Sequence, residues 1–273
     1  MDVLSRVELK GIFTMTNTEF ELAEQFALRT RKHCFVTGKA GTGKTTLLKR
    51  IVERSQKNVV VVAPTGVAAI NAGGVTIHSM FGLPLTCFVP SDDFVDVNIA
   101  TNRRRLLHEH LHFRQEKLRV LREMDLLIID EVSMVRCDTL DAIDLVLRTI
   151  RGSARPFGDT QILLFGDMHQ LPPVVKDAEW NILKAYYRSP YFFDSLVWSP
   201  LSAAQIELRT IYRQSDARFL SLLSHIRDRK MDADDYEHLR ERYDPSFKAA
   251  EEGYVLAERS TCTRCYPRKR SLP

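Results

Sequence analysis

The stretch Cys34-Phe-Val-Thr-Gly-Lys-Ala-Gly-Thr-Gly-Lys-Thr45 passes from an apolar run into a glycine-rich segment. Residues 43–51 then carry apolar side chains at helical spacing, which predicts a strand, a loop and a helix in that order. The pattern G-x-x-x-x-G-K-[ST] fits Gly38 to Thr45. Such a loop turns backbone N–H groups around a phosphate, and the helix N-terminus adds partial positive charge. A glycine-rich turn without a ligand is the alternative, but the flanking strand and helix favour a phosphate site.

Three further apolar runs, at residues 58–63, 126–129 and 162–165, alternate with helical patterns at residues 65–72 and 139–151. Residues 59–62 are all valine, which is typical of a strand covered on both faces of a parallel sheet. We therefore expect an α/β fold, with a mostly parallel sheet flanked by helices. The pattern breaks at residues 82–123, where we expect a small insertion whose basic residues form a solvated helix face or the rim of a nucleic-acid path.

The composition is that of a globular protein, with 44% hydrophobic and 27% charged residues in a chain of 273. No apolar run approaches the roughly 18 residues that a membrane span needs, and the N-terminus lacks a secretory pattern. The five cysteines are scattered and odd in number, which favours reduced thiols in an intracellular protein. Residues 256–273 account for the whole net charge of +4, so binding to nucleic acid must be argued from local residues.

Asp130 and Glu131 directly follow the apolar run at residues 126–129. Both carboxylates should emerge at the carboxyl end of the sheet, where ligands bind in open α/β folds. In a nucleotide hydrolase, Asp130 would hold Mg²⁺ through water and Glu131 would orient or deprotonate the attacking water. A pair of carboxylates that cap a helix is the alternative.

Gln170 follows the run at residues 162–165 and should reach the same edge, where it could sense a γ-phosphate. A turn enforced by Pro172 and Pro173 would also explain this segment. Arg213 is a candidate second cation for the γ-phosphate, although an arginine there, taken alone, is more often a solvated or salt-bridged residue.

Together these segments resemble consecutive motifs of the PIF-type helicases, in the RecD-like branch of superfamily one. The matching segments are Gly38-Lys-Ala-Gly-Thr-Gly-Lys-Thr-Thr46, Ala63-Pro-Thr-Gly-Val-Ala-Ala69, Gly74-Val-Thr-Ile-His-Ser79, Ile129-Asp-Glu-Val-Ser-Met134, Gly166-Asp-Met-His-Gln-Leu-Pro-Pro-Val174 and Tyr212-Arg-Gln-Ser-Asp216. The resemblance implies a RecA-like motor that hydrolyses ATP with Mg²⁺ and moves 5′ to 3′ on single-stranded DNA.

The resemblance also implies roles for individual residues. Lys44 and Thr45 match the Walker A lysine and Mg²⁺ ligand, and Asp130 and Glu131 match the Walker B pair. Gln170 matches the γ-phosphate sensor and Arg213 the motif IV arginine; Gln25 corresponds to an adenine-reading glutamine, in surroundings that match poorly. The residues expected to contact the nucleotide are Gly38, Ala40, Gly41, Thr42, Gly43, Lys44, Thr45, Thr46 and Gln25.

Pro64, Thr65, His78 and Phe81 match the segment that lies against DNA in these helicases. Small polar groups and aromatic rings in loops at one sheet edge also suit a single strand, which is held by backbone contacts and by stacking. Core packing of Phe81 and a helix-capping role for Thr65 are the alternatives.

The resemblance runs from about residue 15 to about residue 254. We expect an N-terminal extension at residues 1–14, a motor domain at 15–204 with its insertion at 82–123, the start of a second motor domain at 205–255, and an atypical basic tail at 256–273. A frameshift or premature stop near Val255 would give this truncated form. It would be a poor motor alone, because the arginine finger, worth about 10³- to 10⁵-fold in turnover, belongs to the second domain.

The leading hypothesis is thus an ATP-dependent DNA helicase that is monomeric, binds ATP and single-stranded DNA, and contacts no membrane; an oligomer stays open. If the source is bacterial, we expect it in the cytoplasm with the nucleoid. One alternative is a P-loop ATPase of another class, whose arginine finger comes from a neighbouring subunit. Another is a nucleotide-binding remnant without helicase activity.

Overall fold

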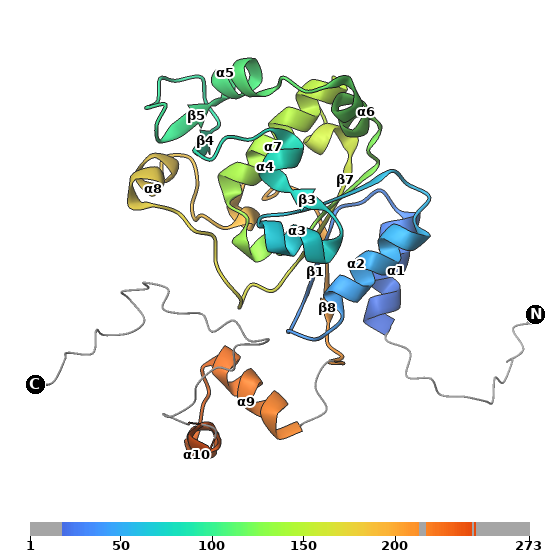
Figure 1. Ribbon diagram of the computed structural model, residues 1–273, viewed down its shortest axis with the longest axis vertical. Coiled ribbons are helices and arrows are strands. Elements are labelled where there is room, and N and C mark those ends of the chain that lie inside the picture. Colours follow the sequence, from blue (N-terminus) through green and yellow to red (C-terminus); the bar gives the residue numbers. More distant parts are fainter. Residues whose placement is uncertain (1–17, 213–216, 242, 244–273) are drawn as a thin grey trace, which may run out of the picture. The chain divides into compact units, whose positions relative to one another are not determined.

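The computed structural model describes residues 18–212, 217–241 and 243 (Figure 1). It divides into two compact units, Met1–Asp216 and Ala217–Pro273. Within the second unit, helix α9 (Ala217–Asp228) is followed by α10 (Ala233–Glu241), and His225 Nδ1 lies 2.7 Å from a carboxylate oxygen of Asp235.

A six-stranded sheet of parallel strands forms the centre of the first unit, in the order β3-β2-β6-β7-β1-β8. Its middle strands are covered on both faces, since every residue of β6 and β7 is buried. The expected α/β fold is confirmed. The strands are β1 Cys34–Gly38, β2 Val59–Ala63, β3 Val75–Thr76, β6 Leu126–Ile129, β7 Gln161–Gly166 and β8 Ala204–Leu208.

Helices α1 (Thr18–Arg29) and α2 (Lys44–Arg54) pack on one face of the sheet, where Leu47, Leu48 and Ile51 are fully buried. The opposite face is covered by α7 (Cys137–Arg151) together with residues of the insertion (Figure 1). The short helices α3 (Gly66–Ala72) and α4 (Ile77–Phe81) follow β2 and β3. The glycine-rich loop at residues 38–45, called the P-loop from here on, and the acidic residues after β6 are therefore carried by a sheet that is packed on both faces.

The insertion contains a two-stranded parallel sheet of β4 (Cys87–Val89) and β5 (Ala100–Asn102). Helix α5 (Arg103–Arg105), a π-helical turn (Leu106–His110) and α6 (Gln115–Glu123) follow, and α8 (Asp177–Leu183) packs beside β4 and β5. Phe88, Leu106 and Leu121 belong to the main core, so the insertion is part of the motor unit rather than a separate subdomain.

Three buried aspartates on α7 hold segments that are distant in sequence. Asp138 accepts a hydrogen bond from the backbone N–H of Phe88 in the insertion (2.8 Å), and Asp144 accepts one from Phe157 (2.6 Å). Asp141 accepts two, from the backbone N–H groups that precede β8 (both 2.9 Å). Because an unpaired buried N–H group is costly, these carboxylates fix the outer layer on this face of the sheet.

The predicted domain boundary at residue 204 needs correction. Ala204–Leu208 forms β8, which pairs in parallel with β1 along its whole length, from Cys34 opposite Ala204 to Gly38 opposite Leu208. The first unit extends to Asp216. Arg213, the extension at residues 1–14 and the tail at 256–273 lie outside the described residues. Among the helices that are described, none is long and apolar enough to cross a membrane.

A glycine at residue 74 is needed where the chain enters β3. A Cβ atom there would lie 2.2 Å from the Val61 carbonyl oxygen, whereas one at Gly66 would meet nothing within 4 Å. We expect Gly74→Ala to lower the free energy of unfolding by about 1–3 kcal/mol or more, because β2 and β3 must separate to admit the methyl group.

Urea unfolding of the two variants would check this expectation. Gly66→Ala is the matched control and should change stability little, since its methyl group has open space. Equal stabilities of the Gly74→Ala and Gly66→Ala variants would contradict the close packing of β2 against residue 74.

Candidate nucleotide-binding site

The glycine-rich loop between β1 and α2 has a turn geometry that depends on glycine. Gly41 and Gly43 have φ angles of 81° and 85°, in the left-handed region that other residues rarely adopt. Helix α2 begins directly after Gly43, whose carbonyl oxygen accepts the N–H of Leu47 at 2.8 Å. The N–H groups of the first helical turn therefore point toward the loop, as an anion site requires.

Lys44 lies across this loop at the start of α2. Its Nζ donates hydrogen bonds to the carbonyl oxygens of Gly38 (2.6 Å) and Lys39 (3.1 Å). Thr42 is buried, and its hydroxyl donates to the Lys39 carbonyl oxygen at 2.9 Å, which closes the loop from inside. Thr45 and Thr46 are exposed in the first turn of α2. The ammonium group is thus held at the loop by weak neutral acceptors that a phosphate could replace.

Asp130 is a buried carboxylate at the end of β6. Its Oδ1 accepts the backbone N–H of Glu131 at 3.0 Å, and within the described part of the chain no ion pair neutralises it. Burial raises the pKa of Asp130 to about 6; the Glu131 N–H opposes this rise, the Glu131 charge adds to it and the Lys44 charge opposes it. Glu131 is half-buried in a left-handed conformation with φ 50°. Such a conformation is a strained one for glutamate and is common at functional sites.

Gln170 belongs to a tight turn after β7. Asp167, which is buried, accepts hydrogen bonds from the His169 N–H (3.1 Å) and the Gln170 side-chain amide (3.3 Å), and its carbonyl oxygen accepts the Gln170 N–H (2.9 Å). Gln170 itself is exposed. The segment forms a turn, but its hydrogen bonds come from Asp167 and not from the prolines that follow. The role of Gln170 as a γ-phosphate sensor stays a prediction.

Sheet order brings these segments together. β7 pairs with β1 on one side and with β6 on the other, all in parallel. The P-loop, the Asp130–Glu131 pair and the Asp167–Gln170 turn consequently leave the sheet at the same edge. The charge of Lys44 acts on the pKa of Asp130, which shows that the two groups lie close enough to interact.

Two aromatic residues beside the P-loop are absent from the sequence-based site. A Cβ atom placed on Gly43 would lie 3.7 Å from the Phe20 ring and 3.7 Å from the Tyr212 ring, so the two rings flank the loop. The Tyr212 backbone N–H also donates to the Gly41 carbonyl oxygen at 2.9 Å. No sequence pattern marks Phe20 as a site residue, because it lies at the start of α1, well before the loop. Tyr212 is part of a matching motif, but only its neighbour Arg213 carries a predicted role.

Helix α1 is fixed to α2 by the buried carboxylate of Glu24. This group pairs with Arg50 Nε (2.7 Å) and Arg54 Nη1 (2.8 Å), and the Arg50 guanidinium also lies 5.6 Å from the centre of the Phe20 ring. Gln25 is exposed on the same helix. Its assignment to adenine recognition stays a prediction.

The residues expected to contact DNA differ in their accessibility. Pro64, Thr65 and His78 are half-buried, and the Thr65 hydroxyl accepts the Ala68 N–H at 3.2 Å as the cap of α3. Burial lowers the pKa of His78, and the charge of Arg136 lowers it further. Phe81 has no exposed surface and packs in the main core. Its predicted contact with DNA is therefore corrected to core packing, since a stacking ring must be accessible.

A family model described as PIF1-like helicase matches residues 20–237. The chain belongs to the PIF1-like helicase family. The ATP-dependent DNA helicase PIF1 of Danio rerio is 36% identical over 202 residues, which are 74% of this chain and 28% of that protein. The ATP-dependent DNA helicase RRM3 of Saccharomyces cerevisiae is 31% identical over 214 residues, 77% of this chain and 27% of that protein.

Solved structures of PIF1-like helicases have the same fold. The Bacteroides Pif1 helicase in complex with ADP-AlF3 and ssDNA is 40% identical with a TM-score of 0.76, over 89% of this chain and 52% of that one. The Candida albicans Pif1 helicase is 30% identical with a TM-score of 0.66, over 90% and 50%. The chain thus spans about half the length of these structures, and about a quarter of the curated relatives.

Removal of the Asp130 charge should stabilise the ligand-free protein at neutral pH. A raised pKa means that the folded state holds the proton more tightly, so stability falls as pH rises from about 4 through about 6. We expect Asp130→Asn to raise the free energy of unfolding at pH 7.5 by up to about 3 kcal/mol, at 1.36 kcal/mol per pKa unit.

Urea unfolding at pH 7.5 and pH 5 would measure this effect. The gain should shrink at pH 5, where the wild-type carboxyl is itself protonated. Glu53→Gln, an exposed change on α2, is the control and should be neutral at both values. A loss of stability at pH 7.5 would show instead that Asp130 has a structural capping role.

Proposed function

We propose that this chain is the ATP-binding motor domain of a PIF1-like DNA helicase, which hydrolyses ATP to drive 5′ to 3′ movement on single-stranded DNA. The observation that carries the proposal is the convergence of the P-loop, Asp130, Glu131 and Gln170 at one edge of the sheet. Phosphoryl transfer needs a phosphate cradle, charge neutralisation and an aligned water, and this edge supplies a group for each.

The P-loop would hold the phosphates of ATP. Helix α2 begins directly after the loop, and Lys44 can exchange its two carbonyl acceptors for phosphate oxygens. Phe20 and Tyr212, whose rings both lie next to Gly43, would bound the nucleotide at the side of the loop. The ADP-AlF3 complex of the Bacteroides relative supports nucleotide binding in this family.

The edge of the sheet that carries Asp130 and Glu131, here called the carboxylate edge, is suited to binding Mg²⁺. Asp130 is buried without a neutralising ion pair in the described residues, and its pKa is raised by burial, which is the situation that a divalent cation would relieve. Thr45 and Asp130 would hold the ion, which supplies charge neutralisation at the β- and γ-phosphate oxygens. Glu131 would accept a proton from the attacking water, and Gln170 would orient the γ-phosphate from its turn.

Single-stranded DNA would bind near the ends of β2 and β3. Pro64, Thr65 and His78 lie on the short connections there and keep accessible surface, whereas Phe81 fills the core behind them. The relative's complex with ssDNA supports this partner. Arg213 would add a second cation at the γ-phosphate; it lies outside the described residues.

Lys44→Ala tests the proposal directly. Charge-assisted hydrogen bonds contribute about 1.5–3 kcal/mol, so the affinity for Mg·ATP should fall by about 10- to 100-fold. Isothermal titration with a non-hydrolysed ATP analogue would measure the change, and single-stranded DNA should stimulate any phosphate release by the wild-type chain.

Lys49→Ala is the matched control, because it removes an exposed lysine from the same helix and should leave affinity unchanged. Turnover at a normal rate that ignores DNA would count against a DNA motor and favour a P-loop ATPase of another class. Tight nucleotide binding without phosphate release would indicate a nucleotide-binding remnant.

A further inference from the structure

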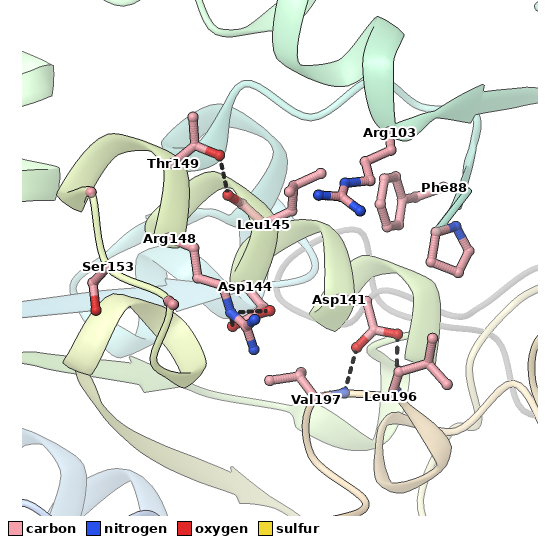
Figure 2. A pocket seen from close by; sticks show the side chains of 13 residues that line it. Phe88, Arg103, Asp141, Asp144, Leu145, Arg148, Thr149, Ser153, Leu196 and Val197 are labelled. Atoms are coloured by element: carbon pink, nitrogen blue, oxygen red, sulfur yellow. Dashed lines mark hydrogen bonds and ion pairs between the residues drawn. The ribbon is translucent and has the colours of Figure 1, made fainter. Parts of the chain in front are cut away.

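A hollow of about 590 Å³ lies beside α7 (Figure 2). Its walls come from α7, from the insertion and from residues 196–197. We call it the α7 hollow. A volume of this size suits a few side chains of a peptide or a small organic molecule.

The acidic groups in the α7 hollow already have partners. Asp141 accepts the N–H groups of Leu196 and Val197, and Asp144 accepts the Phe157 N–H and the Nε of Arg148 (2.9 Å), as the dashed lines in Figure 2 show in part. The Thr149 hydroxyl donates to the Leu145 carbonyl oxygen at 2.8 Å. These acceptors are therefore not available to attract a cationic ligand.

The α7 hollow has, by contrast, more hydrogen-bond donors than its own acceptors use. Arg103 extends from the insertion over Leu145 in Figure 2, and its guanidinium has no acceptor among the residues that the structure describes. Arg148 uses its Nε for Asp144, while its two terminal nitrogens have no acceptor in the same described set. Two guanidinium groups with open N–H donors select an anionic, acceptor-rich ligand.

The other residues that line the α7 hollow restrict the chemical class of the ligand further. Phe88, Pro90, Leu145 and Val197 supply apolar walls beside the two arginines. A nucleic-acid backbone presents a phosphate at every nucleotide and no apolar side chain beside it, so it would leave the apolar walls of the hollow unfilled. A single carboxylate with an apolar side chain next to it fits both the donors and the walls.

The chain itself presents a segment of that chemistry. Residues 91–98, here called the acidic loop, carry Asp92, Asp93 and Asp96 on the surface around Phe94, which is 95% exposed. Hydrogen bonds hold the loop in shape, from the Asn98 N–H to Asp96 Oδ1 (2.9 Å) and from the Asn102 amide to the Asp93 carbonyl oxygen (2.9 Å). A phenylalanine this exposed on a fixed loop loses little conformational entropy when it docks.

We propose that the α7 hollow binds the acidic loop of a second copy of this chain. An aspartate of the loop would pair with Arg103 and Arg148, and Phe94 would pack on the apolar walls. The loop joins β4 to β5, and Pro90 and Arg103 at its two ends also line the hollow. Loop and hollow thus share one face of the molecule, so a two-fold axis between two copies would place each loop in its partner's hollow.

Sedimentation velocity of the full chain at increasing concentration tests the proposal. The wild type should associate to a dimer, and Arg103→Glu and Asp93→Lys should each weaken the dimer by at least about tenfold, since each places like charges opposite one another. An equimolar mixture of these two variants should recover dimers, because both loop–hollow contacts of the mixed dimer again join opposite charges. Phe94→Ser should also weaken the dimer.

Arg122→Glu makes the same charge change on α6, outside the α7 hollow, and is the control that should leave the dimer intact. A wild type that stays monomeric at every concentration would overturn the proposal, as would a mixture of the reversed variants that fails to associate. If Arg103→Glu leaves association unchanged but weakens binding of DNA, the α7 hollow serves nucleic acid and the proposal is wrong.

Discussion

The parallel pairing of β7 with both β1 and β6 is the constraint on which the site depends. Because parallel strands end on the same side, one pairing pattern delivers the P-loop, the Walker B carboxylates and the Asp167–Gln170 turn to a single edge. The fully buried strands β6 and β7 hold these three segments in fixed positions relative to one another, as phosphoryl transfer would require.

The two faces of the sheet serve different purposes. On the α2 face, Glu24 and its two arginines fasten α1 to the helix that begins at the P-loop, so the nucleotide edge is bounded by Phe20. On the α7 face, three aspartates of α7 hold other segments to this helix: Asp138 holds the insertion, Asp144 the connection from α7 to β7, and Asp141 the chain before β8. These aspartates are satisfied by hydrogen bonds, whereas Asp130 at the edge carries its charge without an ion pair among the described residues. The contrast separates carboxylates that hold the fold from one that is suited to a cation.

Hydrophobic spacing and glycine content predicted those elements of the fold that depend on neighbouring residues in the sequence. The strand, loop and helix around Gly38–Thr45 follow from spacing and glycine content alone, and the buried strands follow from their apolar runs. The boundary at residue 204 was wrong because β8 alternates exposed and buried residues, as an edge strand does, and its pairing with distant β1 has no local signature. Phe81 was misplaced because a helix of five residues does not reveal which side faces the core. Phe20 was missed since only tertiary packing brings it to the loop.

Binding of Mn²⁺ in place of Mg²⁺ tests the central claim, that the P-loop and the carboxylate edge form one nucleotide–metal site. Electron paramagnetic resonance would count the bound Mn²⁺ with and without ADP, and the affinity for ADP would be measured with and without the metal. The account predicts one tight Mn²⁺ per chain only when ADP is present, and the same factor of enhancement for both ligands, as linkage requires. ADP affinity that is unaffected by the metal, together with Mn²⁺ binding that is unaffected by ADP, would contradict it.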